Sequence, residues 1–83
     1  MFYVYLLKNE EKSIYIGCTN DLKRRLSEHN LGKSDFTKGH KWEVVYYEAY
    51  KSKDDAFERE KKLKQHGYGK RHLKSRCRRS LLI

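Results

Sequence analysis

Three charged or titratable residues lie on helical arcs that should face a hydrophobic core. Arg25 and His29 share the arc of Leu22 and Leu26 at helical spacing. Glu60 lies on the inward arc of a second helical segment, whose other members are Ala56, Phe57, Leu63 and part of Lys64. A carboxylate on such an arc is costly unless it is paired or holds a cation. Glu60 therefore needs a partner, which is either Arg25, in an ion pair that joins the two helices, or a metal ion.

Tyrosines form the second group with chemical capacity, and the chain has 7 of them. Tyr5 and Tyr15 belong to two strand-like runs, and pairing of these runs would bring their hydroxyls together. A tyrosine has an ordinary pKa near 10, and a nearby arginine, lysine or metal ion would make it a better base. Packing of aromatic rings in a sheet is the simpler explanation for any one tyrosine.

A hairpin is expected at the start of the chain. Residues 2–7 and 13–17 are rich in β-formers, and the polar residues 9–12 form a turn between them. Gly17 is expected to end the second strand and to permit unusual dihedrals or a close approach by another group.

A helix should follow, with Thr19 or Asn20 as its N-cap and Asp21 near the positive end of its dipole. It should stop at Asn30 and Gly32. Residues 32–41 are expected to form a loop.

The rest of the chain alternates strand and helix. Residues 42–50 favour a strand, and residues 54–65 favour a helix capped by Ser52. Residues 70–79 favour a short last helix with Leu73 and Cys77 facing inward. The predicted fold is an α/β (α+β) domain: a small, mainly antiparallel three-stranded sheet flanked by helices, in the order β-β-α-β-α, with this C-terminal helix in addition.

The length of the chain predicts a single domain, residues 1–83, and its charge distribution gives this domain a basic C-terminal end. Residues 1–60 carry 11 Lys/Arg and 11 Asp/Glu, whereas residues 61–83 carry 9 basic residues and no acidic one. This asymmetry favours a nucleic-acid partner, because binding a polyanion releases its condensed counterions. A solubility-promoting tail is the alternative, and a membrane surface fits less well because the tail lacks an apolar helix face.

Two cysteines, Cys18 and Cys77, have no metal-binding spacing, and Cys18 is expected to be a small buried residue rather than a nucleophile. No signal peptide or membrane-length apolar run is present, which predicts a cytoplasmic protein without a membrane partner. No obligate protein partner is evident.

The ordered elements resemble the GIY-YIG endonuclease superfamily, in its small stand-alone branch. The likeness rests on two triplets, Tyr3-Val4-Tyr5 and Tyr15-Ile16-Gly17, followed by two helical segments, residues 18–30 and 56–64. It covers residues 2–65. The first triplet departs from the family pattern because Tyr3 replaces glycine, although its final tyrosine is kept. The basic segment 67–83 matches no core motif and is expected to extend the substrate-binding surface.

The resemblance implies a metal-dependent endonuclease, of a type used in DNA repair. It implies that Glu60 holds one divalent ion, magnesium or alternatively manganese, and that Arg25 neutralises charge at the phosphate. Tyr5 or Tyr15 would accept the proton of the attacking water, or position that water. His29 would orient a tyrosine hydroxyl or contact phosphate, unless it is a surface histidine. The expected nucleic-acid contacts, on DNA rather than RNA and with weak sequence preference, are Gly17, Lys38, Lys41, Lys70, Arg71 and Lys74.

Two other classes of function remain open from the sequence. A non-catalytic nucleic-acid-binding module with the same fold would bind without metal-dependent products. A protein-interaction domain, in which the basic end meets an acidic partner, would show no salt-sensitive affinity for DNA or RNA.

Overall fold

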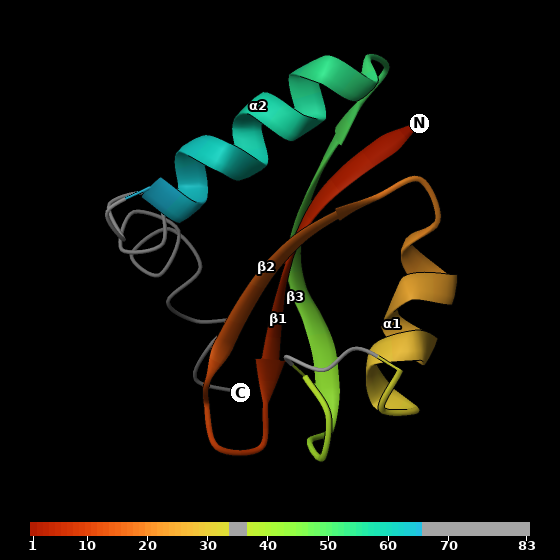
Figure 1. The fold of residues 1–83 in the computed structure, drawn as a ribbon, viewed down its shortest axis with the longest axis vertical. Helices are drawn as coiled ribbons and strands as arrows, with labels where there is room; N and C mark the ends of the chain where they lie inside the picture. The colour runs from red at the N-terminus through yellow and green to blue at the C-terminus, as the bar shows by residue number, and fades with distance from the viewer. Residues whose placement is uncertain (34–36, 66–83) are drawn as a thin grey trace.

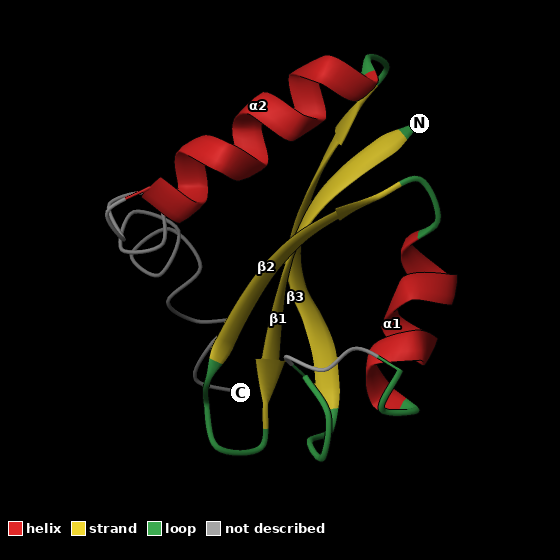
Figure 2. Ribbon diagram, viewed as in Figure 1, coloured by secondary structure: helices red, strands yellow, loops and turns green. Residues whose placement is uncertain are grey.

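The computed structural model describes residues 1–33 and 37–65 and shows a three-stranded sheet with two helices (Figures 1 and 2). The elements are β1 (Phe2–Asn9), β2 (Ile14–Thr19), α1 (Leu22–Asn30), β3 (Trp42–Tyr50) and α2 (Lys53–Lys64). The strand order is β2-β1-β3, and both neighbouring pairs are antiparallel. The predicted order β-β-α-β-α is confirmed. The helix predicted for residues 70–79 lies outside the described residues.

The two helices cover opposite faces of the sheet (Figure 1). Side chains alternate along a strand, so Val4 and Leu6 of β1 face α2, where they pack with Ala56 and Leu63. Tyr5 and Leu7 face the other way, and the residues packed around them are Tyr15, Leu22, Leu26, Trp42 and Val44. The sheet therefore separates two small cores, one beneath each helix.

The start of α1 differs from the predicted one. The N-cap is Asp21, whose side chain accepts a hydrogen bond from the Arg24 N–H at 3.1 Å. Thr19 was an N-cap candidate, but its hydroxyl oxygen accepts the N–H of Asp21 at 3.1 Å, and Thr19 still belongs to β2. The prediction that Gly17 ends this strand is also wrong, because β2 continues two residues further.

The start of α2 was predicted well, but its buried face is narrower than expected. Ser52 caps the helix, and only Ala56 and Leu63 are buried within it. Phe57 is 47% exposed, so its predicted inward position is wrong. At 100° per residue, Leu63 returns to within about 20° of the Ala56 direction, whereas Phe57 points about 100° away from it. Glu60 lies about 40° from that stripe and is half-buried.

A carboxylate fixes α2 against β3. Glu48 accepts two hydrogen bonds from Arg59 of α2, at 2.8 and 3.1 Å. The hydroxyls of Tyr46 and Tyr50, two residues away on either side, donate to the same carboxylate at 2.6 and 2.7 Å. Burial alone would raise the pKa of Glu48, but these partners outweigh it and lower the pKa to about 2.

Candidate active site

Tyr5 and Gly17 form the floor of the candidate site. They are partners in the β1–β2 register, and the phenol of Tyr5 lies across the glycine. A Cβ placed on Gly17 would overlap the Tyr5 hydroxyl and would come within 3.0 Å of the Tyr15 ring. Gly17 therefore permits the close approach that was predicted, and it does so from inside the strand. The predicted proximity of Tyr5 and Tyr15 is also found, since their ring centres are 6.3 Å apart.

His29 of α1 holds the Tyr5 hydroxyl from the opposite side. Its Nε2 lies 3.0 Å from the Tyr5 hydroxyl, and its Nδ1 lies 2.7 Å from the hydroxyl of Thr37. The alternative of a surface histidine is wrong, because His29 is 0% exposed. Burial, together with the positive charge of Arg25, lowers the pKa of His29 below its ordinary value of 6.5. His29 is therefore neutral at pH 7, with one ring nitrogen free to accept a hydrogen bond.

Arg25 brings a guanidinium to the same tyrosines. Burial alone would lower its pKa, but hydrogen bonding with Glu28, Tyr5 and Tyr15 raises it. The bond to Glu28, one turn later in α1, is 3.2 Å long. The ion pair between Arg25 and Glu60 proposed from periodicity is not formed, because α1 and α2 lie on opposite faces of the sheet.

Glu60 of α2 is linked to the tyrosines through its charge and through its partner Lys64. Its carboxylate pairs with Lys64 one turn later, at 3.3 Å, and its side chain is 22% exposed. The Lys64 ammonium lies 5.7 Å from the centre of the Tyr15 ring. The negative charge of Glu60 also acts on Tyr5 and Cys18, where it raises both pKa values. Because β2 is an outer strand, groups from both helices reach the same stretch of it.

Tyr5 is not the ready base that a nearby arginine would suggest. Burial raises its pKa, and although Arg25 opposes this, Tyr15 and Glu60 reinforce it, so that the value stands at about 12. The phenol is consequently protonated at neutral pH. Its hydroxyl is hydrogen-bonded to the buried His29, whose Nε2 accepts this proton in the tautomer that is protonated at Nδ1.

Cys18 lies in β2 beside the site and is half-buried rather than fully buried. Burial raises its pKa, and the charge of Glu60 raises it further. The thiol form dominates at neutral pH, which agrees with the prediction that Cys18 is not a nucleophile.

Residues 1–74 match the model of the GIY-YIG catalytic domain. The chain belongs to the GIY-YIG catalytic domain family. The two GIY-YIG triplets, Tyr3-Val4-Tyr5 and Tyr15-Ile16-Gly17, lie side by side in β1 and β2. The resemblance inferred from the sequence is thereby confirmed.

Individual relatives carry the designation UPF0213. The chain is 38% identical over 65 residues to one such protein of Oceanobacillus iheyensis, covering 76% of each chain. It is 39% identical over 67 residues to one of Clostridium perfringens, covering 78% of this chain and 72% of the relative. The solution NMR structure of a UPF0213 protein from Bacillus halodurans aligns with a TM-score of 0.54 and 33% identity, over 88% of this chain and 81% of that one.

The GIY-YIG resemblance predicts a divalent metal ion with Glu60 as its ligand. Within residues 1–33 and 37–65, no group of three or more His, Cys, Asp or Glu side chains is placed to hold one. Magnesium, however, keeps several waters and uses one or two carboxylates together with substrate phosphates. The partly exposed carboxylate of Glu60 therefore fits an ion held by one protein ligand and completed by the substrate.

Two of the predicted nucleic-acid contacts, Lys38 and Lys41, are exposed on the segment that leads into β3. Lys70, Arg71 and Lys74 lie outside the described residues. In the part of the chain that the structure describes, no helix is long and apolar enough to span a membrane.

Two contributors were not singled out from the sequence. Thr37 stands in a polar loop and carries no pattern that marks it. Asn30 was interpreted as a helix stop, yet its amide also binds the backbone N–H and C=O of Trp42 at 2.6 and 3.0 Å. This pairing fixes the end of α1, and with it His29, against the start of β3.

Proposed function

We propose that this GIY-YIG domain is a divalent-metal-dependent endonuclease that hydrolyses phosphodiester bonds of nucleic acid, DNA rather than RNA, with little sequence specificity. The observation that carries the proposal is the convergence on the paired strands β1 and β2: Arg25 of α1 lowers the pKa of the buried Tyr5, and the charge of Glu60 of α2 raises it. This set combines a cation for phosphate oxygens, a proton-transfer group and a metal-binding carboxylate. A cytoplasmic location accompanies the proposal.

Arg25 is assigned the role of stabilising the negative charge of the transition state. Its planar guanidinium suits two phosphate oxygens at once, and its raised pKa keeps it charged at any working pH. Glu28 accepts one of its N–H groups and so restrains the side chain while leaving other donors free. A substrate phosphate would then lie against Arg25 above the two tyrosine hydroxyls.

Tyr5 is assigned the activation of the attacking water, which it would carry out through a proton relay rather than as a free phenolate. Tyr5 would accept the water's proton as its own proton passes to Nε2 of neutral His29. Thr37, bonded to the other ring nitrogen, would hold the tautomer that leaves Nε2 free to accept. Tyr15, whose ring lies beneath the Lys64 ammonium, would help position the water and the phosphate.

Glu60 is assigned the divalent ion, magnesium or manganese, which would stabilise the charge of the leaving group when bound. Its present partner, Lys64, is 50% exposed, and an exposed pair of this kind contributes roughly 0.5 kcal/mol. That amount is small enough for a divalent cation to displace the ammonium.

The test is cleavage of labelled DNA with magnesium, with manganese and with chelator, by wild-type protein and by Glu60→Gln and Arg25→Ala. Both variants should lose at least about a hundredfold in rate while keeping their thermal unfolding profiles. Glu58→Gln on the same helix and Lys23→Ala on α1 are exposed matched controls that should cut normally. Normal cutting by Glu60→Gln would refute the metal assignment.

A non-catalytic nucleic-acid-binding module is the second candidate. The pKa of about 12 for Tyr5 favours it, because a phenol that keeps its proton at neutral pH is a poor base. Salt-sensitive DNA binding without metal-dependent products in the same assays would establish this alternative.

A further inference from the structure

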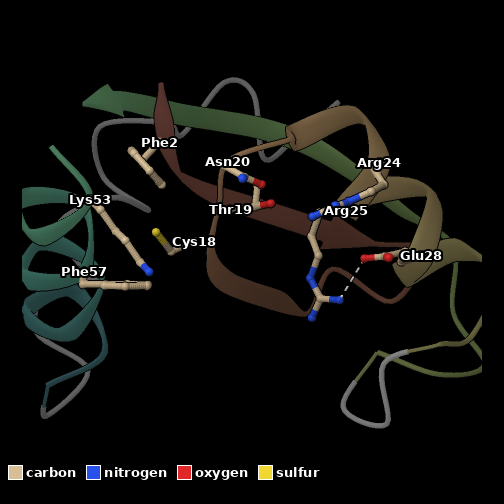
Figure 3. A pocket seen from close by; sticks show the side chains of 9 residues that line it. All are labelled: Phe2, Cys18, Thr19, Asn20, Arg24, Arg25, Glu28, Lys53 and Phe57. Carbon is tan, nitrogen blue, oxygen red and sulfur yellow. Dashed lines mark hydrogen bonds and ion pairs between the residues drawn. The ribbon is translucent and has the colours of Figure 1, made fainter. Parts of the chain in front are cut away.

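An open hollow of about 410 Å³ adjoins the candidate active site (Figure 3). It lies between the first half of α2, which contributes Lys53 and Phe57, and the junction of β2 with α1. Arg25 belongs both to its wall and to the tyrosine cluster. The volume falls within the range of about 300–1,000 Å³ typical of small-molecule sites, so the hollow has room for one nucleotide.

The charges around the hollow favour an anion. Its walls carry Arg24, Arg25 and Lys53 against a single carboxylate, Glu28, which is already bonded to Arg25. Among residues 1–33 and 37–65, Arg24 and Lys53 make no ion pair with a carboxylate, and both are exposed. Cations placed in this way attract phosphate without reading sequence.

Phe57 supplies an aromatic surface beside these cations. Its ring contributes little to the core, since the residue is 47% exposed, and the Lys53 ammonium lies 5.4 Å from the ring centre. A single exposed apolar residue is common on protein surfaces. Phe57 differs because it lines a cationic hollow. Proteins that bind single-stranded nucleic acid combine the same two features: cations that contact the phosphates and aromatic rings on which the bases stack.

We propose that this hollow binds one unpaired nucleotide of the substrate strand next to the cleaved phosphate, with its base against Phe57 and its own phosphate near Arg24 and Lys53. The proposal rests on the proposed function in placing the cleaved phosphate at Arg25. An unpaired nucleotide is required because a base within a duplex is stacked on both faces and cannot lie on a ring.

The test measures binding, in chelator so that no cutting occurs. Dissociation constants are obtained by fluorescence anisotropy for a labelled single-stranded oligonucleotide and for the blunt duplex of the same sequence. Wild-type protein should prefer the single strand. Phe57→Leu should weaken single-strand binding about tenfold, the contribution of one stacked base, and leave duplex binding unchanged. Phe57→Tyr should restore it.

Tyr47→Leu is the matched control, because Tyr47 is 56% exposed and does not line the hollow. It should bind both ligands as wild type does. Lys53→Gln and Arg24→Gln should each reduce the slope of log K against log salt by about 0.7 for the single strand. Single-strand binding by Phe57→Leu equal to that of wild type, or a loss matched by Tyr47→Leu, would overturn the proposal.

The two proposals fail separately. If Phe57→Leu binds the single strand as wild type does while metal-dependent cleavage is intact, only the nucleotide-site proposal is refuted. A clear Phe57 effect in protein that never cuts would remove the endonuclease and leave a site for unpaired nucleotides.

Discussion

At the scale of the residue, the candidate site depends on a buried hydrogen-bonded chain rather than on an activated side chain. His29 is hydrogen-bonded to Tyr5 at 3.0 Å and to Thr37 at 2.7 Å, and all three residues are buried. The tyrosine is too weak an acid to lose its proton alone at neutral pH, since its pKa is about 12. In the proposed relay, His29 would therefore decide whether the proton can leave Tyr5.

This dependence predicts the pH profile of cleavage. Only neutral His29 accepts a proton, so kcat/KM should fall as the pH decreases through its pKa. Because burial and Arg25 lower that pKa, the acid limb should lie below pH 6.5, the ordinary value for histidine. His29→Gln should lower kcat/KM by about a hundredfold and abolish this limb.

The measurement is kcat/KM for a labelled oligonucleotide between pH 5 and 8, with His40→Gln as a control. His40 is a more exposed histidine that pairs with Glu10. The variant at position 40 should keep the full profile. An acid limb that persists unchanged in His29→Gln would exclude the relay.

At the scale of the element, α2 must be held at a fixed angle if Glu60 is to reach around β2. The carboxylate of Glu48, which accepts four hydrogen bonds from Arg59, Tyr46 and Tyr50, connects this helix to β3. Its side chain is 16% exposed, so water would replace the lost carboxylate poorly as an acceptor for these donors.

Glu48→Gln should therefore destabilise the fold by about 2 kcal/mol at pH 7, the order expected when a charged hydrogen-bond partner is removed. The pKa of Glu48 is lowered to about 2, so its contribution is present above the unfolded value of 4.5 and is lost as the pH falls from 4.5 toward 2. Urea denaturation of both proteins should show a difference that narrows across this range.

Glu43→Gln on the same strand is the control, since Glu43 is 62% exposed and its ion pair with Lys8 is long, at 3.5 Å. It should change stability by less than about 0.5 kcal/mol. Equal stability of Glu48→Gln and wild type at pH 7 would show that other contacts hold α2.

The elements also show which parts of the site could be predicted from sequence. Local patterns were sufficient for β3, found at residues 42–50 as predicted, and for the Ser52 cap. They failed at Thr19, whose hydroxyl binds a neighbouring N–H, and at Phe57, because the buried stripe of α2 is narrower than its apolar pattern. Whether Glu60 meets Arg25 or the tyrosines depends on which face each helix covers, which spacing along one helix does not determine.

At the scale of the whole molecule, the positive charge is unevenly distributed along the chain, and the candidate site lies beside β2, an outer strand of the sheet. The chain carries a net charge of +9, and all of it is accounted for by residues 61–83, which hold 9 basic and no acidic residues. Residues 1–60 are neutral on balance, and residues 61–83 are basic. We therefore expect two separate functions: phosphate chemistry beside β2, and sequence-independent attraction of the polyanion by the basic end.

This separation predicts that Lys70, Arg71 and Lys74 contribute to affinity and not to turnover. If each neutralises one phosphate, replacing all three by glutamine should reduce the slope of log K against log salt by about 2.7 on duplex DNA. Cleavage at saturating substrate should be unchanged. Anisotropy titrations between 50 and 200 mM salt in chelator give the slope, and Lys12→Gln, at an exposed hairpin turn, should leave it unaltered. A slope that stays at the wild-type value would place the polyanion contacts elsewhere, whereas a fall in turnover would mean that the basic end also takes part in positioning the cleaved phosphate.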